Sequence, residues 1–249
     1  MFVVKDLMQT DLPNVRVGIG SIADSKHVES SVRVLNKESV KIYYDPKKLV
    51  DDLFSGEIDA AVRGDMSSAE LLRILKEKAE VSELERVVIM EPKNGRAFFM
   101  APVGIDEGRT VEEKRRIAVN AIKLMRKMGA GTRIAVMSGG RIGDKGRNEA
   151  VDRSISDAEM LVSMLQKEMY DAYHAEILIE SAVEEADLII APDGVIGNLI
   201  FRTLHFIGDA VALGAPVLNI DKVFVDTSRV KTDYIDSIIL AMRLAEGRK

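Results

Sequence analysis

The stretch DLIIAPDGVIGNLIFRTL, residues 187–204, changes its hydrophobic period in the middle. Leu188-Ile189-Ile190 is a short apolar run of the kind that forms a buried strand. A Pro-Asp-Gly turn at residues 192–194 ends this run, and the residues after it repeat at helical spacing. Gly197 and Asn198 are poor residues for the interior of a helix, and they suit a place where bare backbone comes close to another group. The stretch therefore predicts a strand, a turn and a helix.

The same alternation of short apolar runs and longer amphipathic ones extends along the whole chain. Helical periodicity predicts helices over residues 67–79, 111–128, 156–168 and 233–245. Strands are predicted over residues 15–19, 40–44, 58–62, 87–90, 134–137, 177–179, 188–190, 210–213 and 223–225. Strands and helices in alternation are typical of an α/β protein with a largely parallel sheet.

The composition restricts the classes of function. With 47% hydrophobic residues, the 249-residue chain can bury one large core or two modest ones. Its 35 basic and 40 acidic residues give a net charge of -5, which offers no electrostatic footprint for nucleic acid or for an anionic membrane surface. The lack of cysteine excludes disulfides, thiolate metal sites and cysteine nucleophiles. We therefore expect small-molecule chemistry in which any thiol belongs to the ligand.

The first residues of the chain and its histidines give two further predictions, one about the cellular compartment and one about metal binding. The first residues, MFVVKDLMQTDLP, lack the basic head and long apolar stretch of a leader, and no run approaches the ~20 apolar residues that cross a bilayer. The sequence therefore predicts a cytoplasmic protein. His27, His174 and His205 lie far apart without metal-ligand spacing, and no cluster of aspartates suits Mg²⁺, so no metal site is expected.

Polar residues follow four of the predicted strands. Because ligands bind beyond the carboxyl ends of the strands in open α/β sheets, these loops are the candidate sites. Each loop taken alone is also consistent with a surface loop or a helix cap, but four such loops at one edge of a sheet would converge on one crevice. The candidate binding residues are Gly64, Ser67, Ser68, Arg73, Ser138, Gly139, Gly140, Asp193, Gly197, Asn198, Ser228 and Arg229.

The loop SGGRIGDKGR, residues 138–147, carries four glycines and three basic residues in ten positions. Exposed backbone N–H groups with cations nearby are what a phosphate group requires. The spacing is not that of a Walker loop, and a mobile surface loop is the alternative interpretation. Gly18-Ile19-Gly20 is similar to the front of a dinucleotide loop, but the third glycine is missing because residue 23 is alanine.

Several of these motifs together resemble the phosphate acetyltransferase and phosphate butyryltransferase family. Residues 192–204, PDGVIGNLIFRTL, resemble the family's PD…GN…(Y/F)K…L segment, and residues 225–229, VDTSR, resemble its terminal LSR or TSR motif. Residues 58–73 are similar to its ADALVxG…TTADTLR segment, and residues 133–138 are similar to RVALLS. The motifs occur in the family's order along residues 55–245.

The resemblance implies an α/β fold of two αβα domains with mostly parallel sheets and a cleft between them, as in isocitrate and isopropylmalate dehydrogenases. Residues 1–102 and 218–249 would form the N-terminal domain, completed by the returning C-terminal segment, and residues 103–217 would form the second. The segment PVGIDEG, residues 102–108, lacks periodicity and predicts the hinge. The chain is short at its N-terminal end and resembles the archaeal subgroup called methanogenesis marker protein 4, or MtxX, once labelled a methyltransferase subunit.

The resemblance also implies a reaction, the exchange of an acyl group between phosphate and the thiol of coenzyme A. Cations must hold the phosphate, a base must take the thiol proton, and donors must meet the oxyanion. By resemblance Arg229 grips the phosphoryl group, Arg73 is a second phosphate cation, and Ser228 stabilises the thiolate or the oxyanion. Asn198 and the amide of Gly197 would border the same pocket.

The base is where the sequence departs from the family. Family members place an aspartate after the Ser-Arg pair, but here the segment from Val230 to Asp233 is shorter, and Val230 stands where the family has glycine. Asp233 is the predicted base and Asp236 the next candidate. Coenzyme A is the expected co-substrate, no tightly bound cofactor is expected, and the resemblance implies a homodimer.

The sequence is consistent with three functions. The first is acyl transfer, or the binding of a related phosphorylated ligand, in a methanogenic archaeon. The second is a non-catalytic binding or assembly protein of methanogenesis that keeps the phosphate cleft. The third is a methyltransferase-related subunit, although the sequence has no complete nucleotide-type glycine fingerprint and no corrinoid-binding histidine motif. The first requires Arg73, Ser138, Asp193, Asn198, Ser228 and Arg229 to meet around one anion-sized hollow.

Overall fold

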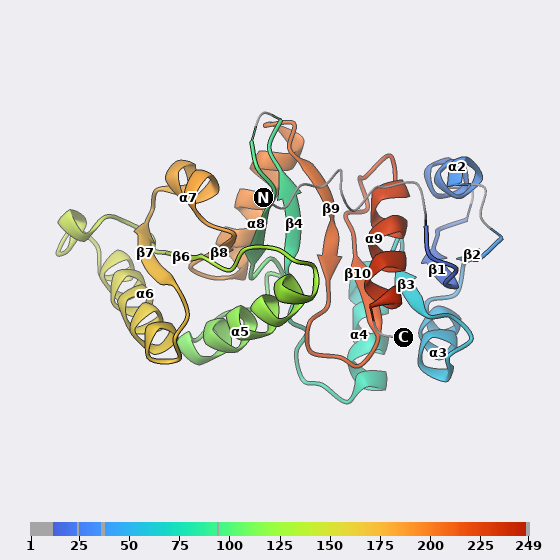
Figure 1. The fold of residues 1–249 in the computed structure, drawn as a ribbon, viewed down its shortest axis with the longest axis horizontal. Helices are drawn as coiled ribbons and strands as arrows, with labels where there is room; N and C mark the ends of the chain where they lie inside the picture. The colour runs from blue at the N-terminus through green and yellow to red at the C-terminus, as the bar shows by residue number, and fades with distance from the viewer. Residues whose placement is uncertain (1–11, 24, 36–37, 94, 248–249) are drawn as a thin grey trace. The chain divides into compact units, whose positions relative to one another are not determined.

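The computed structural model describes residues 12–23, 25–35, 38–93 and 95–247. Residues 1–11, on which the prediction about a leader depends, lie outside the described residues. Strands and helices alternate along the chain and form two compact units (Figure 1). We call Glu85–Ala212 the continuous unit, and we call the described residues up to Leu84 together with those from Leu213 the discontinuous unit.

The discontinuous unit is built on a sheet with the strand order β2-β1-β3-β10-β9. β1 pairs in parallel with β2 and β3, and β10 pairs in parallel with β3 and antiparallel with β9. The C-terminal part of the chain thus adds strands to the sheet that the N-terminal part begins. The strands are β1 (Val17–Gly20), β2 (Val40–Tyr43), β3 (Ala60–Val62), β9 (Val211–Pro216) and β10 (Val223–Asp226).

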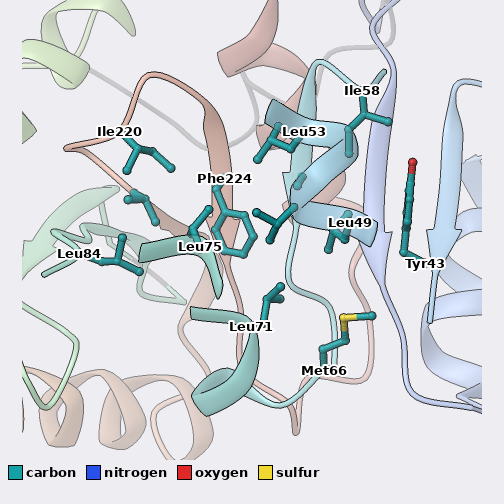
Figure 2. Close-up of a cluster of buried hydrophobic side chains, with 13 residues drawn as sticks. Tyr43, Leu49, Leu53, Ile58, Met66, Leu71, Leu75, Leu84, Ile220 and Phe224 are labelled. Atoms are coloured by element: carbon teal, nitrogen blue, oxygen red, sulfur yellow. The ribbon is translucent and has the colours of Figure 1, made fainter. Parts of the chain in front are cut away.

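Helices cover both faces of this sheet. On one face α3 (Pro46–Ser55) packs against α4 (Ser68–Ala79). On the other face α2 (Lys26–Leu35) packs against α9 (Ile235–Glu246), which also contacts β3 and β10. Figure 2 shows Leu71 and Leu75 of α4 beside Phe224 of β10 in a buried cluster that also contains Leu49 and Leu53 of α3. Because side chains alternate along a strand, the neighbours of Phe224 point to the other face, toward α9. The unit is an αβα sandwich.

In the continuous unit the strand order is β4-β5-β8-β6-β7. β5, β8, β6 and β7 are parallel, and β4 is antiparallel to β5. α5 (Val111–Lys127) packs against α6 (Glu149–Lys167), while α7 (Ile179–Glu185) and α8 (Gly194–Phe206) also contact the sheet. A short 3-10 helix spans Ile142–Asp144. The strands are β4 (Val88–Glu91), β5 (Phe98–Ala101), β6 (Ile134–Met137), β7 (Ala172–Glu176) and β8 (Leu188–Ile190).

Some predicted elements are wrong in position. Residues 177–179 were expected to form a strand, but they lead into α7, and the strand is β7 before them. β7 escapes detection because its residues Tyr173 and His174 are only half-buried. The helix expected from residue 156 begins at Glu149, because Asn148 accepts the N–H of Ala150 at 2.8 Å and caps it. β5, α2 and α3 were not predicted.

The predicted hinge at residues 102–108 is a packed loop of the continuous unit. Glu107 is buried, accepts a hydrogen bond from Arg86 Nε at 2.5 Å, and accepts the N–H of Gly104 at 3.1 Å. The boundary after residue 102 would also have placed β4 and β5 in the other unit, but β5 pairs with β8. The division between the units therefore falls earlier, before Glu85.

Candidate functional site

Two loops of the discontinuous unit are joined at the carboxyl ends of β3 and β10. Arg63 Nε forms a buried ion pair with Asp226 Oδ1, and Arg63 Nη1 donates to Met66 O at 3.0 Å. Thr227 Oγ1 donates to Gly64 O at 2.7 Å. Because β3 and β10 are neighbouring parallel strands, their following loops share one edge of the sheet, and these bonds fix the loops against each other.

The loop after β1 joins the same network. Asp65 Oδ1 accepts the N–H of Ile22 at 2.8 Å. Gly64 has a φ of +62°, and a Cβ on it would lie 1.8 Å from Gly20 O. Only glycine combines this left-handed conformation with such a close approach. Gly64, predicted to border a phosphate, thus holds the ends of β1 and β3 together.

An open hollow of about 520 Å³ lies beside these loops. Ser67 reaches it from the start of α4, Lys26 and His27 reach it from the start of α2, and Arg229 reaches it from the segment after β10. Among the described residues, no carboxylate pairs with Arg229, which is exposed. Cationic side chains and hydroxyls around one concavity are suited to an anion. The described residues that line it are Ile22, Ser25, Lys26, His27, Asp65, Ser67 and Arg229.

The structure thus brings together two of the residues predicted to bind phosphate, Ser67 and Arg229. Ser68 is the first residue of α4, and Arg73 on the same helix forms an ion pair with Glu77 at 2.6 Å. Ser228 precedes Arg229, and its Oγ accepts the N–H of Val230 at 3.4 Å. Ser68, Arg73 and Ser228 are not among the residues that line the hollow.

The predicted base has a structural role at the start of α9. Asp233 Oδ1 accepts the N–H of Ile235 at 2.8 Å and the Ser31 hydroxyl at 3.3 Å. Asp236, the next candidate, is partly buried, and burial raises the pKa of its carboxyl while the nearby Lys231 opposes the rise. A raised pKa makes a carboxylate a better acceptor for a thiol proton. Neither aspartate lines the hollow.

The turn at residues 192–194 starts α8 in the continuous unit. Asp193 Oδ1 accepts the N–H of Ile196 at 2.8 Å and caps the helix. Asn198 Nδ2 donates to Val103 O at 2.9 Å, so this side chain ties α8 to the loop that precedes α5. Lys114, a buried residue of α5, donates from Nζ to Pro192 O at 3.0 Å. The turn is therefore held from two sides by residues of its own unit.

The glycines of α8 explain why the helix begins with such residues. A Cβ on Gly194 would lie 1.6 Å from Gly104 O, and one on Gly197 would lie 2.0 Å from Pro102 O. The group that the bare backbone approaches is thus the 102–107 loop. In the structure these glycines have a packing role, whereas their predicted contact with a ligand stays a prediction.

The glycine-rich loop after β6 is held by side chains of its own unit. Gly139 N–H donates to Ser154 Oγ at 2.9 Å, and Ile142 N–H donates to Glu176 Oε1 at 2.9 Å. The N–H groups of Arg141 and Gly146 also donate to carboxylates, those of Asp144 and Asp152. Much of the N–H capacity that the sequence assigned to a phosphate is therefore used within the unit.

Ser138, predicted at the same site, is buried and pairs with a histidine. Its hydroxyl donates to Gly140 O at 2.8 Å, and its Oγ lies 2.8 Å from His174 Nε2. With the hydroxyl proton donated to Gly140, Ser138 accepts from His174 in the tautomer that carries its proton on Nε2. Within the described residues, nothing hydrogen-bonds to the buried Nδ1. The pair holds the loop to β7, which carries His174.

This pair predicts a dependence of stability on pH. Burial lowers the pKa of His174 below 6.5, although Glu159 and Glu176 oppose the change, and Lys145 adds to it. The unfolded chain then takes up a proton near pH 6.5 that the folded chain takes up only at lower pH, so the folded state loses stability as pH falls below 6.5. We expect the melting temperature to fall less between about pH 7 and pH 5 in His174→Gln than in the natural protein.

A second histidine of the same unit provides the control. His205 lies on α8, where its Nδ1 is 2.7 Å from Ala210 O, and it does not contact Ser138. His205→Gln should keep the full decrease in melting temperature. An equal decrease in the natural protein and His174→Gln would show that His174 does not cause it.

The candidate binding residues and the predicted base Asp233 are divided between the two units. Six of them belong to the continuous unit, and seven, including Asp233, belong to the discontinuous unit. That residues of both surround one hollow stays a prediction. In the part of the chain that the structure describes, no group of three or more His, Asp or Glu side chains is arranged to hold a metal ion. No helix within the same residues has the length and apolar character that crossing a membrane requires.

Comparisons with known proteins bear on both fold and family. A model of the family described as phosphate acetyl/butaryl transferase matches residues 41–242. A relative from Methanosarcina mazei, described as putative methyltransferase mtx subunit X, is 39% identical over 232 residues, which are 93% of this chain and 81% of the relative. The resemblance drawn from the motifs is therefore confirmed.

Solved structures show the same architecture. A branched-chain phosphotransacylase from Enterococcus faecalis has a TM-score of 0.74 at 15% identity, covering 92% of this chain and 99% of that chain. A 4-hydroxythreonine-4-phosphate dehydrogenase from Klebsiella pneumoniae has a TM-score of 0.58 at 10% identity, covering 97% of this chain and 92% of that chain. At these identities the likeness shows the fold alone, and it confirms the predicted mostly parallel α/β class.

Proposed function

Because this chain belongs to the phosphate acetyl/butaryl transferase family, we propose that it transfers an acyl group between phosphate and the thiol of coenzyme A. The observation that carries this proposal is the hollow shared by Ser67 and Arg229. These residues come from two motifs far apart in the sequence, each of which resembles a motif of the family. A small acyl phosphate is the ligand class that follows.

The chemistry assigned to the hollow is the binding of the phosphoryl group. The guanidinium of Arg229 offers parallel N–H donors that match two phosphoryl oxygens, and the hydroxyl of Ser67 adds a third donor. The sulfur of coenzyme A attacks the acyl carbon, the C–S bond forms, and the C–O bond to phosphate breaks. The thiol proton goes to a carboxylate, for which Asp233 and Asp236 are the proposed candidates, and Ser228 is the proposed donor to the oxyanion.

The direct test is an assay of thioester formation. Purified protein is incubated with coenzyme A and acetyl, butyryl and branched-chain acyl phosphates, and the thioester is followed by its ultraviolet absorbance. Phosphate-dependent loss of thioester should be seen in the reverse direction. If neither direction proceeds at high protein concentration, while phosphate still binds, the transfer reaction is excluded and a binding function remains.

Arg229→Met is expected to weaken the binding of inorganic phosphate without unfolding the protein. Loss of a charge-assisted pair costs about 2–3 kcal/mol, which corresponds to roughly 30- to 150-fold in Kd. Since Arg229 is exposed, the melting temperature should stay the same. Isothermal titration calorimetry measures the affinity and differential scanning calorimetry measures the melting temperature.

The matched control is Arg33→Met, because Arg33 is an exposed arginine of the same unit at the end of α2 and does not line the hollow. It should bind phosphate as the natural protein does. Arg73→Met tests the predicted second phosphate cation in the same titration. A large drop in the melting temperature of Arg229→Met with unchanged phosphate affinity would show that Arg229 is structural.

A non-catalytic ligand-binding protein is the second candidate function. The observation that favours it is the position of Asp233, whose Oδ1 is used at the start of α9. The name of the Methanosarcina mazei relative, putative methyltransferase mtx subunit X, adds a methyltransferase subunit to the alternatives. Calorimetric binding of S-adenosylmethionine would support that alternative, and a stable protein partner recovered equally with Arg229→Met would support the non-catalytic one.

We also propose that two copies of the chain associate through α8. This helix exposes apolar side chains along its length, with Val195 59% and Leu199 65% exposed, and only Gly194 and Gly197 of the helix are buried. Contiguous apolar surface of this kind marks interaction sites in proteins. Sedimentation equilibrium of the natural protein and of Leu199→Asp measures whether a dimer forms and whether this face is required.

A further inference from the structure

The hollow of the discontinuous unit extends beyond the residues that resemble the family's motifs. Ser67 and Arg229 belong to motifs at residues 58–73 and 225–229, whereas Ser25, Lys26 and His27 come from the segment after β1. Two groups of donors thus face the same space, one at the start of α4 with Arg229 and one at the start of α2. The second group has no role in the proposed phosphate contact.

The size of the hollow exceeds what one phosphate needs. A water molecule occupies about 30 Å³ in the liquid, and the five bonded heavy atoms of a phosphate ion lie closer together than five separate waters, so a phosphate needs less than roughly 150 Å³. The hollow holds about 520 Å³ and lies within the range of sites for small organic ligands, ~300–1,000 Å³. A phosphate held by Arg229 therefore leaves space beside Lys26 and His27.

The charge of this second group favours an anion. Lys26 is exposed in the first turn of α2, where the helix dipole disfavours a cation, and no carboxylate among the described residues forms an ion pair with it. Glu29 shares that turn but does not line the hollow. Among the described residues that line the hollow, Asp65 is the only carboxylate, and its Oδ1 accepts the N–H of Ile22. An anion beside Lys26 and His27 would relieve the unfavourable position of Lys26.

We propose that the hollow takes a ligand with two anionic groups, the first held by Arg229 and Ser67 and the second by Lys26 and His27. This inference rests on the proposed function only in placing a phosphoryl group at Arg229. It adds the substrate class: a small phosphorylated molecule that carries a further phosphate or a carboxylate. Pyrophosphate and phosphoglycolate represent these two chemistries, and inorganic phosphate represents a single group.

The test compares these three probes by calorimetry on the natural protein and on Lys26→Met/His27→Gln. We expect at least one of the two-group probes to bind about 10- to 100-fold more tightly than inorganic phosphate, the range for a charge-assisted contact. The double variant should lose that advantage and bind inorganic phosphate as before. Lys47→Met is the matched control, because Lys47 is an exposed lysine in the first turn of α3 and does not line the hollow.

The outcomes separate this inference from the acyl-transfer proposal. Equal affinities for all three probes, or an equal loss of affinity for all three in the double variant, would overturn the two-group ligand and leave the acyl-transfer assay unaffected. An advantage that depends on Lys26 and His27 supports the inference even when no thioester forms. Equal losses in Lys47→Met would attribute the effect to net charge and would also overturn it.

Discussion

Asp226→Ala is expected to destabilise the protein by about 3–5 kcal/mol, the cost of leaving one member of a buried ion pair without its partner. The side chains of Arg63 and Asp226 are 7% and 11% exposed, so water cannot replace the lost carboxylate. The same carboxylate also accepts the N–H of Thr227 at 2.9 Å. The free energy of unfolding is measured by urea denaturation followed by circular dichroism.

An exposed pair of the same unit provides the control. The side chains of Arg73 and Glu77 are 59% and 63% exposed, so Glu77→Ala should change the free energy of unfolding by no more than about 0.5 kcal/mol. The double variant Arg63→Met/Asp226→Leu removes both charges and should recover part of the stability lost in Asp226→Ala. If Asp226→Ala and Glu77→Ala have equally small effects, the buried pair is not what fixes the loops after β3 and β10.

The elements predicted correctly are the longer amphipathic helices and the fully buried strands. α4, α5 and α9 carry apolar residues at helical spacing, and β6, β8 and β10 are buried along their length. α2 and α3 were missed although both are amphipathic, because each has only ten residues and depends on packing against neighbouring helices. Short helices of this kind take most of their stability from tertiary contacts that one sequence does not reveal.

Which residues line the hollow depends on which strands are neighbours in the sheet, so the site could be predicted only where the strand order could be predicted. Ser67 and Arg229 meet because β3 and β10 are parallel neighbours, and the family resemblance implied such an arrangement. Lys26 and His27 were missed because the segment after β1 has no recognisable anion motif. The available signal was positional, since β1 also pairs in parallel with β3 and its following residues share the same sheet edge.

Glycine carries the least specific signal in this chain. In α8 the same residue type serves equally for contact with a ligand and for contact with another segment of backbone, and sequence alone does not separate the two. The loop at residues 102–107 was expected to be a hinge and is instead the surface against which Gly194 and Gly197 pack. The hinge prediction and the missed packing role of these glycines therefore have one cause. The contact between the 102–107 loop and the start of α8, which are far apart in sequence, was not recognised.

Gly194→Ala should consequently destabilise the protein by at least about 2 kcal/mol, in the range for overpacking in a rigid site. The added Cβ would lie 1.6 Å from Gly104 O and 2.9 Å from Glu107 O, both backbone atoms. Relieving that contact moves the start of α8 and breaks the 3.0 Å hydrogen bond from Gly194 N–H to Glu107 O. The effect is opposite in sign to the gain of about 1 kcal/mol that alanine brings to a helix interior.

Gly143→Ala is the matched control in the same unit, because a Cβ on Gly143 meets no atom within 4 Å and the backbone there is not left-handed. It should change the free energy of unfolding by less than about 0.5 kcal/mol, as surface substitutions do. Urea denaturation of the two variants measures the difference. If Gly194→Ala is as stable as Gly143→Ala, α8 does not pack closely on the 102–107 loop, and the bare backbone at its start is available to a ligand instead.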